Sequence, residues 1–522
     1  MNILKSRWSK LIIFISIILV IVYYGVNPFL NKLLIAQVES KLIGNFSYKY
    51  DTIQVNIFKR SVVLKEVAWQ FPKDTSQLKH KGRVKQFTVE GISWTSIFGD
   101  LSIKHLEIAS PEFNSKIQVN KLLNQIEDTA RRDQFNFYNL IKGQLKSLKI
   151  DQITITNGQA KWYAPDFKTI WRELNDGSLT MTAIAIDSLT TANQGGMFGL
   201  DEFILSFKNG RIFLADSLHQ ISLGKTILNK NKQIAEIDSL QINVLLSEKE
   251  IYRRFKYEKT ALTLLAPKII LTGADYEKLF TKQYIDIQKI KIANLDLQVY
   301  KDKNALTPDF KKPPLPQQLV QQLSNSIKID SILINNASIT YTQKAKETDQ
   351  KGAVFFTDLN AEITNLTNDS VLLQETPITL MNFSTKLYNK SQLKGTVFFD
   401  MTSKTQAHTF DGELSPFNLM EANRLLAPLT TYQFKSGNIN QLKFRFNADN
   451  RRAVGTLSFI YDNLRIEKGN SYRLKGHQFD EQIISFVANT FIIKNSNPDW
   501  HGKKRGGKIY YDRNLNKAIF QY

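Results

Sequence analysis

The commonest pattern along this chain is an alternation of apolar and polar residues with a period of two, which predicts β-strands. In many places the alternation slips by one residue across a polar pair. Leu148 and Ile150, for example, give way to Ile153 and Ile155. Other copies are Phe87/Val89 before Ile92/Trp94, Leu101/Ile103 before Leu106/Ile108, Ile285/Ile287 before Ile290/Ile292, Ile327/Ile329 before Ile332/Ile334, and Phe459/Tyr461 before Leu464/Ile466.

This phase slip has a geometric consequence. Side chains alternate between the two faces of a strand, so two polar residues between apolar pairs would put the second pair on the opposite face. A β-bulge, a bend or a strand exchange restores the face, and a bulge also increases the local twist. We therefore expect a long, twisted sheet that is curved instead of flat.

Two copies of the slip are also similar in their residues. Ser147–Asn157 and Ser326–Asn336 share a serine, a lysine, an aspartate, an asparagine and three isoleucines at matching positions. The intervals between copies are irregular, which favours a sheet built from hairpins of unequal length over a strict repeat. The second apolar pairs of these two copies are Ile153 with Ile155 and Ile332 with Ile334.

Helical spacing of apolar residues is rare. It predicts a short helix from Pro28 to Gly44, a longer one over 119–142, and short helices over 166–174, 274–282 and 315–323. The segment from Thr307 to Pro316 holds four prolines, which deny backbone donors to a sheet and therefore predict a linker or loop.

An uncharged, mostly apolar run extends from Leu11 to Leu30 and follows Lys5, Arg7 and Lys10. About 20 such residues suffice for a helix to cross the roughly 30 Å of a bilayer's hydrocarbon. The basic flank predicts that the start stays in the cytoplasm and that the rest is exported. A cleaved signal peptide is the rival interpretation, but Tyr23 to Pro28 make a poor cleavage site, so we expect a retained anchor.

The predicted fold is mainly β: one N-terminal transmembrane helix followed by an elongated, twisted antiparallel β-sheet with a few short helices. The predicted divisions are a cytoplasmic flank and transmembrane anchor at 1–30, an N-terminal part of the exported sheet at 31–306, a Pro-rich linker or loop with a short helix at 307–325, and a C-terminal part of the exported sheet at 326–522.

Charge and cysteine content narrow the possible partners. The net charge of +21 would suggest nucleic acid for a cytoplasmic protein, but export argues against that partner. The cations are spread among the strands, and both a solvated basic face and attraction to anionic lipid head groups remain open. With no cysteine, the chain has neither disulfides nor thiol chemistry, so its stability must come from packing and backbone pairing.

No constellation of catalytic residues is visible in the sequence. The six histidines stand apart from one another, without the spacing of a zinc site. Asp-Ser pairs recur, but they fall at slips or turns, which both residues favour by bonding nearby backbone. There is no Gly-x-Ser-x-Gly elbow and no phosphate loop. We therefore expect no enzyme activity, no cofactor and no metal site.

The two ends of the chain carry a resemblance to a known family. Its C-terminal motifs are Leu414–Leu419 and Leu425–Leu429, then Tyr461–Leu464, Asn497-Pro498 and Arg505–Arg513. Together with the N-terminal anchor and the Leu101–Pro111 segment, their order resembles the AsmA-like, TamB-related proteins of two-membrane bacteria. The resemblance implies an inner-membrane anchor and a repeating periplasmic β-groove whose apolar inside holds acyl chains. On that expectation the predicted sheet is an elongated, twisted antiparallel β-sheet groove, and the predicted lining of the groove is Ile153, Ile155, Ile332 and Ile334.

Two functions follow from these expectations. In the first, the protein binds or conducts lipid, phospholipid above all, between membranes and so supports outer-membrane homeostasis. In the second, it is a periplasmic scaffold that carries no lipid and assists outer-membrane assembly through contacts with an envelope protein. An open apolar groove favours the first function and a sealed interior favours the second.

Overall fold

The computed structural model describes residues 47–56, 58–71, 79–93, 100–116, 138, 146–164, 168–193, 199–306, 314–346, 349–430, 432–468 and 495–513. Of the described residues, 67% lie in strands and 11% in helices, which confirms the prediction of a mainly β protein with a few short helices. The chain divides into two compact units, Met1–Arg211 with Ile227–Asn231 and Ile212–Thr226 with Lys232–Tyr522. Each unit is described by itself.

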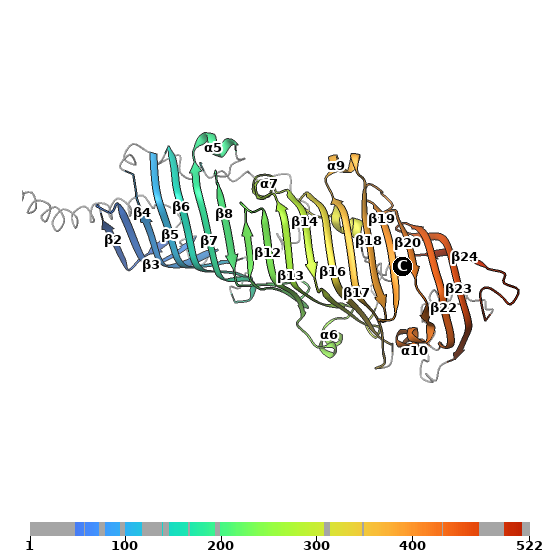
Figure 1. Cartoon of the computed structure of the whole chain (residues 1–522). Coiled ribbons are helices and arrows are strands. Elements are labelled where there is room, and N and C mark those ends of the chain that lie inside the picture. The colour runs from blue at the N-terminus through green and yellow to red at the C-terminus, as the bar shows by residue number, and fades with distance from the viewer. Residues whose placement is uncertain are drawn as a thin grey trace, which may run out of the picture. The chain divides into compact units, whose positions relative to one another are not determined.

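The strands and helices follow one another closely along the chain (Figure 1). In chain order the strands are β1 (Ser47–Lys49), β2 (Thr52–Asn56), β3 (Ser61–Phe71), β4 (His80–Glu90), β5 (Asp100–Lys116), β6 (Ser147–Tyr163), β7 (Ile170–Ile186), β8 (Glu202–Phe207), β9 (Asn209–Phe213), β10 (His219–Leu223), β11 (Thr226–Asn229), β12 (Ile234–Val244), β13 (Thr260–Ala274), β14 (Ile285–Ala293), β15 (Asp296–Asp302), β16 (Ile327–Lys344), β17 (Lys351–Thr367), β18 (Ile378–Leu387), β19 (Ser391–Asp400), β20 (His408–Leu414), β21 (Phe417–Asn418), β22 (Tyr432–Ala448), β23 (Arg452–Lys468) and β24 (Gly506–Asp512). The helices are α5 (Ser188–Asn193), α6 (Glu248–Arg254), α7 (Tyr276–Lys282), α8 (Pro316–Gln321), α9 (Ser370–Glu375), the 3-10 turn η5 (Leu419–Ala422) and α10 (Asn423–Leu429).

The sheet of the first unit is mixed. Strands β2 to β5 pair antiparallel in chain order, β5 and β6 pair parallel, and β6 to β8 are again antiparallel. A parallel pair needs a long crossover, and residues 117–146 supply it between β5 and β6. The helix predicted over 119–142 falls in this crossover and, apart from Tyr138, lies outside the described residues.

The second unit repeats this arrangement on a larger sheet. Strands β12, β13 and β14 are antiparallel, β14 and β15 both pair parallel with β16, and β16 to β20 continue antiparallel to β22, β23 and β24. The prediction of an antiparallel sheet is therefore wrong at these parallel pairs. The chain leaves β15 through a connection that holds α8, so β16 starts again from the end at which β14 starts.

The phase slips coincide with residues of positive φ. Ala183 (φ 52°) stands across from Asp151, and Asn365 (φ 58°) stands across from Asp330. At each of these places the ladder omits one pair on both strands, and the register on either side is kept. The phase of alternation therefore changes on both strands together.

The predicted restoration of the face is confirmed. In the first unit Ile150, which precedes a slip, and Ile153, which follows it, pack into one apolar cluster. Their neighbours on β7, Ile184 and Met181, belong to the same cluster. A left-handed residue is costly for any side chain but glycine, about 1–2 kcal/mol. The left-handed residues occur despite that cost, and one face of the sheet stays apolar across the slip.

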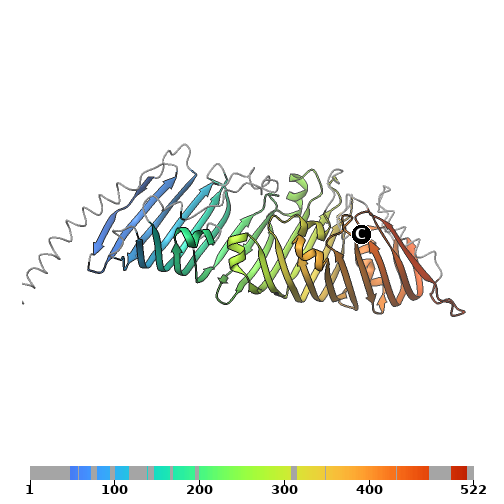
Figure 2. The same cartoon turned by 90° about the horizontal axis from the view of Figure 1, so that it is seen from above.

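The short helices lie at the ends of strands (Figure 2). Two of the predicted helices are confirmed, as α7 and α8. The helix predicted over 166–174 is wrong, because Ile170 to Leu174 belong to β7 and complete the ladder with β6. The helix predicted from Pro28 to Gly44 and the anchor lie outside the described residues, as do 307–313 of the Pro-rich segment. The predicted divisions at 30/31, 306/307 and 325/326 stay predictions.

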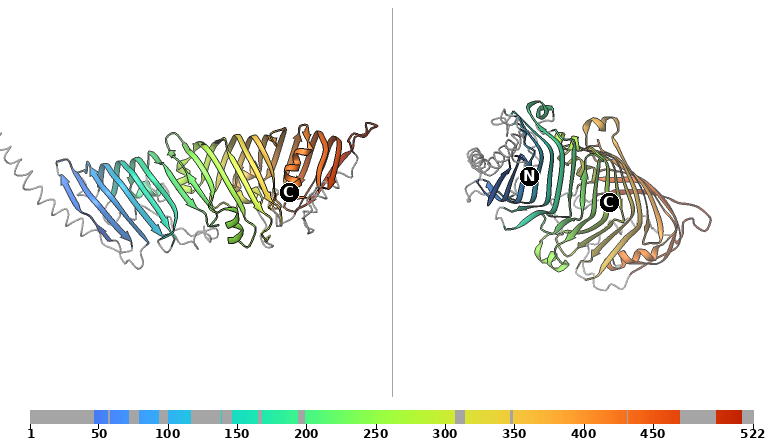
Figure 3. Two further views of the ribbon diagram at one scale, coloured as in Figure 1. Left: turned by 90° about the horizontal axis from the view of Figure 1, so that it is seen from below. Right: turned by 60° about the vertical axis from the view of Figure 1, so that its left-hand side comes forward.

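A closed hydrophobic core occurs in the C-terminal part of the second unit. There Phe459, Tyr461 and Leu464 of β23 are buried in one cluster with Phe434 and Ile439 of β22. The turn η5 adds Leu419 to this cluster, and α10, which packs against β17 and β22, adds Leu426. Figure 3 shows the bend of the strands around this end of the unit.

Candidate functional site

The four residues predicted to line a groove occupy equivalent positions in the two units. Ile153 and Ile155 lie on β6 of the first unit, and Ile332 and Ile334 lie on β16 of the second. Both strands re-enter their sheet after a long connection and pair parallel with an earlier strand, β5 and β14 respectively. All four side chains are half-buried, so none lies in a sealed core.

The register of the second unit extends these positions into two rows that cross eleven strands. Every member of either row is apolar or glycine, and we call the two rows the apolar face of the second unit. One row consists of Ile237, Ile269, Ile292, Ile334, Ala361, Phe383, Gly395, Gly412, Phe444, Leu457 and Gly507, and the other consists of Ala235, Leu271, Ile290, Ile332, Ile363, Met381, Val397, Phe410, Phe446, Gly455 and Ile509.

The first unit has a matching pair of rows across seven strands, which we call the apolar face of the first unit. Again every member is apolar. The rows are Ile53, Leu64, Phe87, Ile108, Ile155, Leu179 and Leu205, and Val55, Val62, Val89, Leu106, Ile153, Met181 and Phe203.

The opposite face of each sheet is mostly polar. In the second unit the row between the two apolar rows runs through Leu333, the residue after Ile332, and contains only two apolar residues. Its members are Glu236, Ile270, Lys291, Leu333, Glu362, Asn382, Thr396, Asp411, Arg445, Thr456 and Lys508. The sheet is thus amphipathic, with water on the polar face.

Glycines shape the C-terminal part of the apolar face of the second unit. A Cβ on Gly412 would lie 2.1 Å from Cζ of Phe444, and a Cβ on Gly395 would lie 2.6 Å from Cζ of Phe383. These glycines therefore leave space for aromatic rings from neighbouring strands. Phe410 stands among them, with ring centroids 5.2 Å from Phe444 and 5.9 Å from Phe383. The result is an aromatic floor on this part of the face.

Most members of the two apolar faces are half-buried, although the strands that carry each row pair with one another without a gap. A row residue has row neighbours on the adjacent strands, which removes part of its surface from water. Only a second layer would remove the rest, and most of these side chains are not buried to that degree. The buried exceptions with side chains are Val55, Ala235, Ala361, Val397 and Leu457. On both units the apolar face therefore keeps apolar surface that a ligand can cover.

A hollow of about 630 Å³ lies on the polar face of the second unit. It runs along the row from Gly395 to Leu457 and is walled by the residues on either side of that row, whose side chains point away from the apolar face. Four of its five charged side chains pair across strands, Arg445 with Asp411 at 3.5 Å and Lys443 with Glu413 at 3.4 Å, and the fifth is Lys394. The pairing accounts for most of the charge without a ligand.

The buried histidine His219 has a structural role. His219 bonds the Asp216 carboxylate through Nδ1 at 2.5 Å, and its Nε2 accepts the backbone N–H of Leu262 at 3.0 Å, which ties a turn to β13. Burial acts to raise the pKa of Asp216, but bonds from His219 and two backbone N–H groups outweigh it and lower that pKa. Among the described residues, no three His, Cys, Asp or Glu side chains are placed to hold a metal ion.

The sequence identified four members of the two faces and missed the others. Each missed residue does alternate with polar neighbours, and Phe444 and Phe446 show that signal clearly. Periodicity places a residue on a face of its own strand, but it does not state which residue of another strand stands beside it. That information comes from the register.

Comparison with known proteins finds no family model and no curated protein that matches this chain. The resemblance to the AsmA-like family thus stays a prediction. No helix in the described part of the chain is both long and apolar enough to cross a membrane. The predicted anchor, Leu11 to Leu30, lies outside that part.

Proposed function

We propose that this chain is an inner-membrane-anchored, periplasmic β-groove protein of the AsmA-like type, which binds or conducts lipid between membranes and supports outer-membrane homeostasis. The observation that carries the proposal is the apolar face of the second unit, on which 22 successive cross-strand positions are apolar or glycine, most of them half-buried.

The energetics favour an acyl chain as the occupant. Soluble proteins seldom leave a large contiguous apolar patch in water. Covering it stabilises the complex by roughly 25 cal/mol per Å² of apolar surface removed from water, or about 0.8 kcal/mol for each methylene of the ligand. The faces hold no charged residue that would fix one polar ligand, and an unbranched chain needs none.

The dimensions also suit an acyl chain. Neighbouring strands lie about 4.8 Å apart, so eleven strands span on the order of 50 Å along the rows of the second unit. Twist shortens this distance. An extended acyl chain laid along the rows, across the strands, would contact several of them at once. The role is one of binding, with no catalytic residue, cofactor, metal or nucleic acid involved.

The scaffold alternative rests on a different observation. In the C-terminal part of the second unit, η5 and α10 close a core that includes Leu457 of the apolar face, and Phe444 packs against it. A protein whose apolar face is closed by its own helices needs no lipid. If the same closure extended over Ile332, the chain would act through protein contacts with an envelope partner.

A photo-crosslinking amino acid in the full-length chain, kept in its native membrane, tests the proposal. Ile332 and Leu333 are adjacent, apolar and half-buried, and they point to opposite faces of β16. A crosslinker at Ile332 should capture lipid and one at Leu333 should not. Equal capture at both positions, or none at Ile332, would contradict a lipid path along the apolar face.

Topology is tested separately. Because cations precede the run from Leu11 to Leu30, a reporter fused after Tyr522 should be active only if it works outside the cytoplasm. The mature protein should also retain its first residues. A mature N-terminus near Asn27 would show a cleaved signal peptide instead of an anchor.

A further inference from the structure

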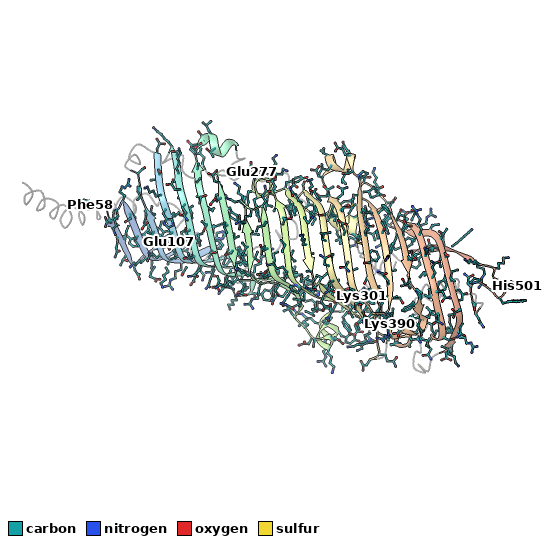
Figure 4. The ribbon with its side chains drawn as sticks, in the orientation of Figure 1. Phe58, Glu107, Glu277, Lys301, Lys390 and His501 are labelled. Carbon is teal, nitrogen blue, oxygen red and sulfur yellow. The ribbon has the colours of Figure 1, made fainter. Side chains whose placement is uncertain are left out.

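The turn that precedes β24 carries the most exposed large apolar side chain among those described. Trp500 is 89% exposed. His501, Lys503 and Lys504, which follow it, are exposed as well. Figure 4 shows His501 at the outer end of this turn, clear of the last strands. Its ring lies against that of its neighbour His501, with the centroids 3.4 Å apart, and most of its surface is left to solvent.

The turn is nevertheless well ordered by hydrogen bonds. Asp499 accepts the backbone N–H groups of His501 at 3.1 Å and Lys503 at 3.0 Å, and its carbonyl accepts the N–H of Gly502 at 2.8 Å. Gly502 has φ 78°, a conformation that suits glycine. These bonds order the backbone of the turn that carries Trp500.

A buried asparagine fixes the turn to the sheet. The Asn497 side chain donates to the carbonyls of Phe459 and Arg505 and accepts the Arg505 N–H at 2.9 Å. The Arg505 guanidinium donates to the Ser496 carbonyl at 2.7 Å. The Arg505 side chain is therefore held by hydrogen bonds within its own chain. The positive charges left for a partner are those of Lys503 and Lys504.

The turn and the lysine that follows it are net positive. Asp499 is the one acidic residue from Asp499 to Lys504 and its carboxylate accepts backbone N–H groups, and in the described part of the chain neither Lys503 nor Lys504 forms an ion pair. Tryptophan prefers the boundary between head groups and acyl chains, and lysines beside a membrane are attracted by anionic lipids. An exposed tryptophan next to two lysines on an ordered turn matches that boundary.

We propose that the Asp499–Lys503 turn, with Lys504, docks on an anionic lipid surface by inserting Trp500 among the head groups. This rests on the proposed lipid-binding function, since the apolar rows end at Gly507 and Ile509 of β24, the strand that this turn leads into. A docked turn would bring the end of the apolar face next to a membrane from which lipid is taken or to which it is given.

The absence of cysteine allows a direct test. The full-length chain with His501→Cys, labelled with an environment-sensitive fluorophore and held in phosphatidylcholine nanodiscs, is mixed with vesicles. Vesicles that contain phosphatidylglycerol should give a blue-shifted, brighter signal, and pure phosphatidylcholine vesicles should give little change. Trp500→Ser in the labelled chain should abolish the shift. Lys503→Gln with Lys504→Gln should weaken vesicle binding about 25-fold, at roughly fivefold per lysine.

A matched control removes two exposed cations from another place in the second unit, Lys256→Gln with Lys259→Gln, and should leave the signal unchanged. An equal loss in this control would show general attraction instead of docking by the turn. No response to any vesicle, or a response that survives Trp500→Ser, would overturn the inference. Lipid capture at Ile332 is measured separately, so either proposal can fail while the other stands.

Discussion

The apolar pattern of the second unit has two different outcomes. In the middle, Ile332 and Ile334 follow a phase slip on β16 and remain half-buried. In the C-terminal part, Leu464 follows the same kind of slip on β23 and is only 1% exposed. The difference is that η5 and α10 contribute side chains to the cluster around Leu464. A strand pattern therefore makes an apolar face, and a covering layer decides whether that face becomes a core.

The largest effect is expected from a charge in the closed region. Leu464→Asp would bury a carboxylate without a partner and should lower the free energy of unfolding by about 4 kcal/mol or more. Urea unfolding of the full-length chain measures this. Arg465→Ala, at the exposed neighbouring position, is the control and should change it by about 0.5 kcal/mol or less. Similar losses in both variants would mean that the C-terminal cluster is not a closed core.

An intermediate loss of stability is expected when the buried charge of Glu258 is removed. The Glu258 carboxylate, 8% exposed, lies 3.1 Å from Nζ of Lys301 and 3.2 Å from Nζ of Lys303. Burial acts to raise the pKa of Glu258, but the charges of Lys303 and Lys301 and their hydrogen bonds outweigh it and lower that pKa overall. Glu258→Gln leaves two lysines without their counter-charge and should lower the free energy of unfolding by about 3 kcal/mol.

The same group gives the middle region a pH dependence. Because the folded-state pKa of Glu258 is depressed, its contribution is complete above the unfolded-state pKa and is lost as the pH falls through the folded-state value. The free energy of unfolding, measured by fluorescence at a series of pH values from neutral to acidic, should decline. The decline should be smaller in Glu258→Gln. An identical acid decline in both proteins would assign it to other carboxylates.

The smallest effect on stability is expected on the apolar face itself. Ile332→Asp places a carboxylate between Ile290 and Ile363, but a half-buried position lets it reach water. The loss should be about 1 kcal/mol or less, with an unchanged β spectrum, and co-purified lipid should fall. Leu333→Asp, on the polar face, should keep the lipid. Unfolding of the Ile332 variant would show a closed core at that row, and retained lipid would remove Ile332 from the lipid path.

Local pattern was sufficient for several features of this protein. A period of two specified mainly β structure, because adjacent side chains of a strand face opposite ways whatever lies beside it. The slips at Asp151 and Asp330 specified a local irregularity that restores the face, since the apolar residues on both sides have to share one environment. The helices α7 and α8 were readable from their own apolar spacing.

Long-range contacts decided the rest. The sequence suggested only antiparallel hairpins, and the crossovers into β6 and β16 made the sheets mixed. Ile170 to Leu174 have helical spacing, yet pairing with β6 satisfies their backbone groups and makes them a strand. The chain alone determined which residues are apolar and on which side of their strand they stand. Register aligned them into rows, and the packing of η5 and α10 closed one part of the face. Local pattern did not determine either feature, because both depend on residues far apart in the sequence.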